Sequence, residues 1–152
     1  IMRPLPTRQD LSATSITVAV AAIVWPLAFL TVSSNATLPS IAALVVQLCA
    51  LIMMFSATIV LGSNFSIFPH YRQVIVSGPY ALVRHPLYAA YLTFDGAMVC
   101  DQGTITVLLL WIVEAALLAW RAEREERLLA ACTADYVQYI TQVRYRFIPF
   151  IY

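Results

Sequence analysis

The sequence predicts an all-α integral membrane protein with about four transmembrane helices, of which the last two form a short hairpin, and a cytoplasmic C-terminal cap of helix and aromatic residues. Of its 152 residues, 61% are apolar and 11% are charged, whereas soluble domains are about 45–50% apolar and about 25% charged. A globule of this size cannot hide so many apolar side chains from water. The apolar residues also fall into runs of helical length that polar segments separate. Lipid is therefore the expected surrounding.

The first two runs are each long enough to cross a bilayer. Residues Ala13–Val32 and Ile41–Leu61 carry no charge, and each approaches the roughly 20 residues that span the hydrocarbon. Trp25-Pro26 predicts a kink in the first run rather than its end, because neighbouring helices can satisfy the carbonyl that proline frees. This run lacks a short apolar core followed by a small-residue cleavage site, so we expect a retained anchor rather than a cleaved signal.

Two shorter runs, Leu87–Cys100 and Ile105–Trp120, follow and are joined by the turn 101–104. At about 1.5 Å per residue, the first of them reaches only about 20 Å. We therefore expect the two runs to pack as the arms of a helical hairpin. The next residues, Arg121–Ala131, are rich in helix-forming types and are expected to continue the last helix out of the bilayer. The tail after them suits an interfacial lid, with the rings of Tyr136, Tyr139, Tyr145, Phe147 and Phe150.

The basic residues determine the expected orientation. All nine of them are Arg, and four spans place every one on the same side of the membrane, which the positive-inside rule makes the cytoplasm. Both chain ends are then cytoplasmic. The nine residues are Arg3, Arg8, Arg72, Arg84, Arg121, Arg124, Arg127, Arg144 and Arg146.

Charge and cysteine content exclude several classes of function. The formal net charge is +1 and the chain has no Lys, whereas a nucleic-acid-binding protein needs a strong, clustered positive excess. Cys49, Cys100 and Cys132 are odd in number and lie far apart, so they indicate neither a disulfide framework nor a thiolate metal site. We expect no nucleic-acid partner and no metal, and we interpret the cysteines as packing residues.

The densest cluster of polar and aromatic residues is the segment 77–88. Gly78-Pro79 indicates a turn, and Pro86 suits the first position of the third span. His85 then stands at the N-cap with Arg84 beside it. Free N–H groups at a helix N-terminus, an Arg and a His can bind an anionic group such as a carboxylate or a phosphate. The alternative is an interfacial turn whose Arg and His only touch lipid phosphates.

Acidic residues give a second set of candidates. Glu114, Arg121 and Glu125 are spaced by seven and four residues, so they share one face of the last helix. A carboxylate within a span is costly and suggests a functional site. For Asp95 and Glu114, the alternative is that they are protonated or hydrogen-bonded between the hairpin arms. Glu125 and Glu126 lie just outside the bilayer among Arg residues, where either a site or a solvated helix face explains them.

Three sequence elements follow one another in the C-terminal part: SGPYALVRHPLYAAYL, RAEREERLL and YVQYITQVRYRFIP. In this order on a membrane scaffold they resemble the isoprenylcysteine carboxyl methyltransferase family, together with the related membrane phospholipid methyltransferases. Residues 62–66 (GSNFS) also resemble an element of that family. The resemblance covers about Leu61–Tyr152, and it departs from the family pattern where Ala90 and Asp135 replace glycines. The matching residues are Gly78, Pro79, Tyr80, Arg84, His85, Pro86, Tyr88, Glu125, Glu126, Tyr136, Tyr139, Arg144, Tyr145, Arg146 and Pro149.

The resemblance implies an S-adenosylmethionine-dependent methyltransferase in a single membrane domain. Residues 1–61 would form two N-terminal spans and residues 62–152 the cofactor-binding core. The cofactor would lie in a cytoplasm-facing pocket capped by the C-terminal segment, and a lipophilic acceptor, either a carboxylate or an amine, would enter from the bilayer. A compact chain of this kind resembles the bacterial branch of the family, which implies the inner (cytoplasmic) membrane.

The resemblance also implies roles for individual residues. The backbone from Tyr80 to Pro86 binds the cofactor, Glu125 positions cofactor or acceptor or takes a proton from an amine, and Arg144 or Arg146 binds an acidic group. The implied catalytic residues are Glu125 and Arg144. The implied cofactor-binding residues are Tyr80, Val83, Arg84, His85, Pro86, Tyr88, Glu125, Glu126, Tyr136 and Tyr139.

Two other functions stay open beside the methyltransferase. In the first alternative, the chain is a non-catalytic four-helix membrane scaffold whose Arg-rich face binds anionic lipid. In the second, it is a nicotinamide-dependent membrane reductase of related C-terminal architecture. The sequence leaves open the identity of the acceptor and the oligomeric state.

Overall fold

The computed structural model describes residues 39–62 and 74–149. These two ranges contain four α-helices and one short 3₁₀ helix, η2, and no strand lies in them. The all-helical prediction is therefore confirmed for this part of the chain, whereas the predicted first span, 13–32, lies outside it. The elements are α3 (Ile41–Leu61), η2 (Gly78–Ala81), α4 (Pro86–Gln102), α5 (Ile105–Cys132) and α6 (Ala134–Gln142).

Helix α3 has the bounds that the second apolar run predicts. It begins after Ser40, whose Oγ accepts a hydrogen bond from the Ala43 N–H at 3.2 Å, a contact typical of an N-cap. It ends at Gly62, where φ is +50°, a conformation that glycine adopts more easily than other residues. The Ser40 N–H also donates to Asp101 Oδ1 at 3.0 Å. This bond joins the start of α3 to the end of α4.

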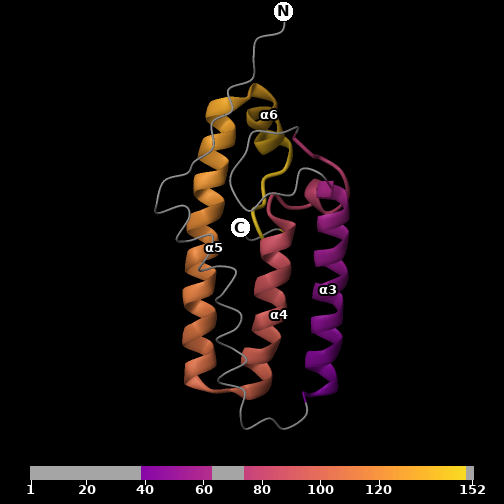
Figure 1. Cartoon of the computed structure of the whole chain (residues 1–152), viewed down its shortest axis with the longest axis vertical. Helices are drawn as coiled ribbons and strands as arrows, with labels where there is room; N and C mark the ends of the chain where they lie inside the picture. The colour runs from indigo at the N-terminus through magenta and orange to yellow at the C-terminus, as the bar shows by residue number, and fades with distance from the viewer. Residues whose placement is uncertain (1–38, 63–73, 150–152) are drawn as a thin grey trace, which may run out of the picture.

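Helices α4 and α5 run antiparallel and side by side, as expected for a hairpin (Figure 1). Pro86 occupies the first turn of α4, and Gly103 ends this helix with φ +60°. Thr104 then caps α5 by accepting from the Val107 N–H at 3.4 Å. The connection is thus shorter than the predicted turn 101–104, because residues 101 and 102 belong to the last turn of α4.

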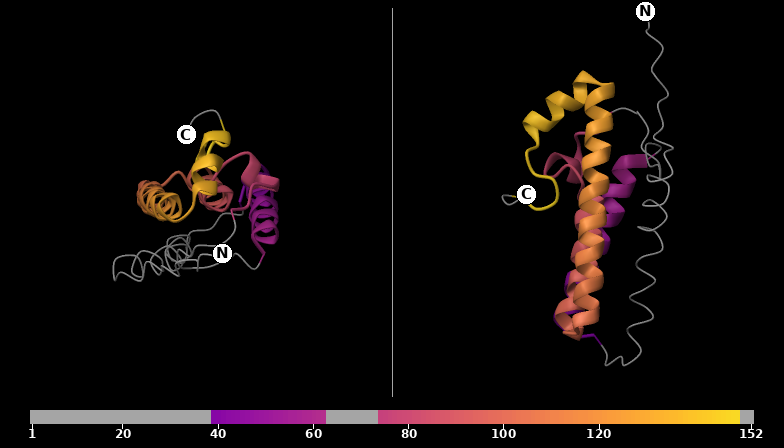
Figure 2. Two further views of the ribbon diagram at one scale, coloured as in Figure 1. Left: turned by 90° about the horizontal axis from the view of Figure 1, so that it is seen from above. Right: turned by 90° about the vertical axis from the view of Figure 1, so that its left-hand side faces the viewer.

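The three long helices lie in a row with α4 in the middle (Figure 2). On α3, the buried residues Ala43, Ala50 and Ala57 recur every seven positions, and such small side chains let neighbouring helix backbones approach closely. Helix α5 runs well past the start of α4 (Figure 1). The helix is continuous from its apolar part into the charged segment 121–131, as predicted.

Two of the described helices, α3 and α5, are long and apolar enough to cross a membrane. Large apolar side chains of α3 point outward, with Ile41, Phe55 and Ile59 at 81%, 66% and 75% exposure. This exposure suits contact with lipid rather than water. Helix α4, at 17 residues, is shorter.

Helix α6 and the tail turn back toward the start of α4 (Figure 2). Thr133 ends α5 and also caps α6, since its Oγ1 accepts from the Asp135 N–H at 3.2 Å. Tyr136 and Tyr139 are buried and pack with Val143 into one apolar cluster. This cluster places the following residues, 143–147, next to the segment that precedes α4.

Candidate functional site

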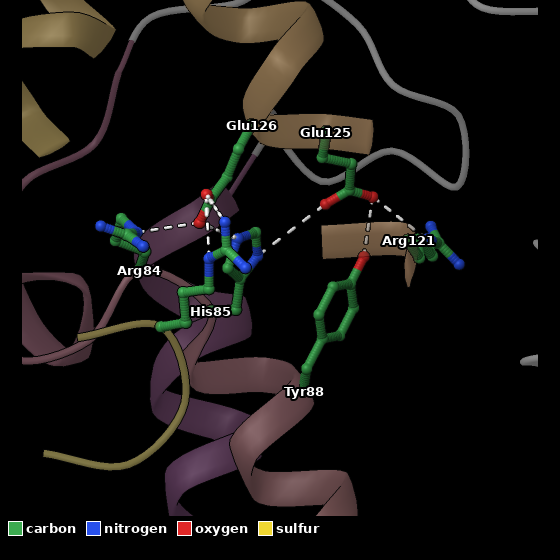
Figure 3. A network of polar contacts seen from close by, with 7 residues as sticks. Arg84, His85, Tyr88, Arg121, Glu125 and Glu126 are labelled. Atoms are coloured by element: carbon green, nitrogen blue, oxygen red, sulfur yellow. Dashed lines mark hydrogen bonds and ion pairs between the residues drawn. The ribbon is translucent and has the colours of Figure 1, made fainter. Parts of the chain in front are cut away.

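Three segments that are distant in sequence meet at the end of the helices that is predicted to face the cytoplasm. They are residues 84–88, the charged part of α5, and the tail 143–147 (Figure 3). Two backbone hydrogen bonds fix the tail, because the Arg84 N–H donates to Tyr145 O and the His85 N–H donates to Arg146 O, both at 2.9 Å. Pro86 then starts α4 without needing a donor of its own. The side chains of Arg84 and His85 before this proline, and of Tyr88 after it, contact glutamates of α5.

Glu126 is the centre of the ionic network. Its Oε1 accepts from Arg84 Nε at 2.8 Å and lies 3.1 Å from His85 Nε2. Its Oε2 is 3.1 Å from Arg146 Nε and 3.0 Å from Arg146 Nη2. Burial would raise the pKa of this carboxyl, but the hydrogen bond from His85 and the charges of His85, Arg84 and Arg146 outweigh it, so the pKa lies below its ordinary value.

The neighbouring Glu125 has different partners. Its Oε1 accepts from the Tyr88 hydroxyl at 2.7 Å and from Arg121 Nε at 3.0 Å. Its Oε2 lies 3.9 Å from His85 Nδ1, which is beyond hydrogen-bond distance. One oxygen of Glu125 is thus held by two donors, while the other faces the imidazole.

Aromatic rings line the space between these glutamates and the tail. The rings of His85 and Tyr88 are stacked, with centroids 5.3 Å apart and an interplanar angle of 2°. Phe147 lies against both, at 5.8 Å from His85 and 6.5 Å from Tyr88. The Arg121 guanidinium covers the Tyr88 ring at 5.6 Å, within the range of a cation–π contact.

Three further tyrosines hold η2 and α6 beside this network. The Tyr139 hydroxyl donates to Tyr80 O at 2.7 Å, and the rings of Tyr136 and Tyr139 lie 5.7 Å apart. Burial, together with the negative charge of Glu125, raises the pKa of Tyr80 to about 12. Burial is also the main cause that raises the pKa of Tyr136 and Tyr139. All three are therefore neutral hydroxyls at pH 7.

The structure brings most of the predicted site residues together. Arg84, His85, Tyr88, Glu125 and Glu126 form one network (Figure 3). Val83 and Pro86, which flank Arg84 and His85 in the chain, are buried. The bond and ring contact described above join Tyr80, Tyr136 and Tyr139 to one another. Val143, which packs with Tyr136 and Tyr139, accepts a hydrogen bond from Arg84 Nη1 at 3.2 Å.

Arg144 and the backbone at residues 84 and 85 have other surroundings than the sequence predicts. Arg144 is exposed and makes no ion pair within the described part of the chain, whereas Arg146 joins the network. Within the backbone from Tyr80 to Pro86, which was expected to bind the cofactor, the N–H groups of Arg84 and His85 donate to carbonyls of the tail. Most of the GSNFS element lies outside the described residues.

Arg121 and Phe147 take part in the network although neither was among the predicted catalytic or cofactor-binding residues. Arg121 was expected to share a helix face with Glu125, and Phe147 to belong to the aromatic lid. Arg121 precedes Glu125 by four residues, and this spacing is a usable signal for a side-chain contact on a helix. Phe147 lies in the aromatic tail, where nothing in the sequence says which ring turns toward His85.

Of the two residues that replace glycines of the family pattern, Ala90 is completely buried in α4. Asp135 lies in the first turn of α6, where a negative charge favours the helix.

Asp95 and Glu114 form a separate pair deeper in the hairpin. They lie on α4 and α5, are 5% and 4% exposed, and hydrogen-bond to each other. Such a bond requires one of the two carboxyl groups to hold a proton. Glu114 Oε2 has no hydrogen-bond partner among the described residues. The two carboxyl groups thus make the contact between the hairpin arms that the alternative interpretation expects.

Two helices that are long and apolar enough to cross a membrane, with a charged and aromatic site at one end of the helices, are the arrangement of a helical membrane protein. The model of the Isoprenylcysteine carboxyl methyltransferase (ICMT) family matches residues 40–131, more than half of the chain, and the chain belongs to this family. The match includes the segment 84–88 and both glutamates, whereas the tail lies beyond it. A comparison with curated proteins found no match. The resemblance seen in the sequence is confirmed at the level of the family, which is one of membrane methyltransferases.

Proposed function

We propose that this protein transfers a methyl group from S-adenosylmethionine to a lipophilic acceptor at the cytoplasmic face of a membrane. The proposal rests on family membership and on one observation, the unequal environments of two adjacent glutamates. All four polar contacts of Glu126 join it to cationic or imidazole groups that fix the tail. Glu125 instead keeps one oxygen, Oε2, turned toward the stacked rings of His85 and Tyr88.

The residues present fit the chemical groups of this cofactor. When bound, it supplies an electrophilic methyl group on a positively charged sulfur, together with an α-amino acid end and an adenine ring. Glu125 Oε2 and the faces of the stacked rings offer a carboxylate and π surfaces to a cation. Exposed Arg144 offers a guanidinium to a carboxylate. The backbone N–H groups of residues 84 and 85 already donate to carbonyls of the tail, so they do not offer donors to the cofactor.

The acceptor determines how much chemistry Glu125 must perform. A carboxylate acceptor is already ionised at pH 7, so the site needs to align it and to keep water out. An amine acceptor that is protonated at pH 7 would first lose a proton, which frees the nitrogen lone pair. The lone pair would then form the new bond to the methyl carbon, while the carbon–sulfur bond breaks and its electron pair stays on sulfur. Glu125 Oε2 is the candidate base, since Oε1 is already held by Tyr88 and Arg121.

The proposed topology follows the orientation that the arginines predict. The chain is one domain of four spans with both termini cytoplasmic, residues 1–61 supplying two spans and residues 62–152 the cofactor-binding core. The short arm α4 and the long arm α5 carry the site at their cytoplasmic ends, and the tail 143–147 caps it. The acceptor enters from the bilayer, and the membrane is the bacterial inner membrane.

Cofactor binding by the purified protein in detergent tests the proposal. We expect saturable binding of S-adenosylmethionine or its demethylated product, and loss of this binding in a folded His85→Ala variant. Arg127→Gln, on the exposed surface of α5, is the matched control and should bind as the wild type does. A folded wild type that binds neither compound contradicts the proposal, and binding of a reduced nicotinamide would favour the reductase.

A screen with a labelled methyl donor then identifies the acceptor class. Lipid-soluble carboxylates and amines are offered in the same detergent, and the labelled product is extracted into organic solvent. Transfer to one class above the level of the His85→Ala variant is the expected result. No transfer to any lipophilic acceptor, despite cofactor binding, would contradict the activity while leaving the binding site in place.

A further inference from the structure

Arg121 is the first charged residue after the apolar part of α5, and it contacts two residues of the network, Glu125 and Tyr88. Its Nε donates to Glu125 Oε1 at 3.0 Å, and its guanidinium lies over the Tyr88 ring. The Tyr88 hydroxyl donates to the same Oε1 at 2.7 Å. Arg121, Glu125 and Tyr88 therefore form a closed triangle of contacts.

The two donors on one oxygen have a geometric consequence. The terminal torsion of a glutamate side chain is broad, so a carboxylate held by nothing rotates freely between orientations. Two donors that share Oε1 restrict this rotation and leave Oε2 on the side of His85 Nδ1, 3.9 Å away. Without Arg121, a single bond from Tyr88 would hold the carboxylate.

A neighbouring pair on the same helix gives a comparison. Arg127 and Glu123 have the same spacing of four residues and also form an ion pair, but their side chains are 75% and 44% exposed. The side chains of Arg121 and Glu125 are only 15% and 20% exposed. Exposed pairs of this kind contribute little because water competes for them, whereas the less exposed pair is screened less and orients its members more firmly.

We infer that Arg121 is a positioning residue for the proposed methyl transfer, which acts by fixing the orientation of Glu125, both directly and through the Tyr88 ring. This inference rests on the proposed function. Arg121 itself need not touch the cofactor or the acceptor, because its effect passes through Glu125. The guanidinium is suited to this task, since its planar donor group can bond to a carboxylate and lie over an aromatic ring at the same time.

A double-mutant cycle tests the inference. The rate is measured per mole of cofactor-binding sites, so that partly unfolded protein does not count. For an amine acceptor, whose proton Glu125 would take, Arg121→Gln is expected to lower kcat by about 10–10²-fold, the loss typical of a misplaced group, with cofactor affinity changed less than kcat. For a carboxylate acceptor, the loss is expected in cofactor affinity. Arg121→Lys keeps the charge but not the planar group, and should recover part of the rate. Arg127→Gln is the matched control and should behave as the wild type.

The decisive comparison is made on the Glu125→Gln background. If Arg121 acts through Glu125, adding Arg121→Gln there changes kcat and the cofactor dissociation constant by less than about twofold, the usual tolerance of additivity. An equal effect on both backgrounds, or a single variant in which both constants are unchanged, overturns the inference while the proposed function stands. A wild type that neither binds cofactor nor transfers a methyl group overturns both.

Discussion

The hydroxyl of Tyr88 donates a hydrogen bond to Glu125 Oε1 at 2.7 Å, and the two residues lie on the two arms of the hairpin, α4 and α5. The Tyr88 ring is at the same time stacked on His85. The position of the carboxylate is therefore linked to the position of the imidazole through one side chain. This link joins the two parts of the proposed site that the sequence places 37 residues apart.

Tyr88→Phe removes this hydrogen bond and keeps the ring. Because the bond goes to a carboxylate, we expect the free energy of unfolding in detergent to fall by about 1.5–3 kcal/mol, with retention of the helical circular dichroism. The rate of methyl transfer should also fall, because Glu125 loses one of the two donors that orient it. Unchanged stability together with an unchanged rate would show that the bond has no role in orienting Glu125.

Glu126 should make the stability depend on acidic pH. Its folded pKa lies below the ordinary value of 4.5, so the folded state binds fewer protons than the unfolded chain when the pH is near that value. The resulting stabilisation is complete above the ordinary pKa and is lost as the pH falls through the folded pKa. Melting temperatures of the wild type should therefore drop between neutral and acidic pH.

The Glu126→Gln variant is the test of this assignment. It leaves Arg84 and Arg146 without their carboxylate, so the melting temperature at pH 7 should be lower than in the wild type. Its further loss on acidification should be smaller, because the group that titrates is gone. Parallel pH profiles for the variant and the wild type would assign the acid sensitivity to other groups.

The sequence predicted the helices well because each has a local signal. The uncharged run Ile41–Leu61, Pro86 at the start of α4 and Gly103 at its end need no knowledge of distant residues. The ring of His85 and the carboxylates of Glu125 and Glu126 were also predicted to belong to one site. The resemblance supplied that grouping, since 40 residues separate His85 from Glu125 along the chain.

Other parts of the site depend on tertiary contacts that no local pattern encodes. The tail carbonyls of Tyr145 and Arg146 accept from the backbone donors at 84 and 85, and no local pattern at the start of α4 predicts this contact. Arg146 rather than Arg144 is the partner of Glu126 because a bend begins at residue 146. The spacing of the two arginines in the sequence does not distinguish them.

The buried pair Asp95 and Glu114 predicts a thermodynamic coupling across the hairpin. Asp95→Leu or Glu114→Met removes one partner of a buried hydrogen bond and leaves the other without it, which should cost about 1–3 kcal/mol in each variant. The double variant places two apolar side chains of similar size in contact and should cost less than the sum. Unfolding in detergent measures all four proteins, and additive losses would mean that the two carboxyl groups do not interact.

Glu125→Gln distinguishes the two classes of acceptor. For an amine, the amide cannot take the proton, so kcat should fall by about 10²–10⁴-fold, the usual contribution of a general base. For a carboxylate no proton is released, and the main effect should be weaker cofactor binding, because the side chain no longer carries a negative charge. Glu123→Gln, an exposed glutamate two residues earlier on the same helix, is the matched control. Equal rates of transfer by Glu125→Gln and the wild type, on every acceptor that the wild type methylates and at every cofactor concentration, would remove Glu125 from the proposed site.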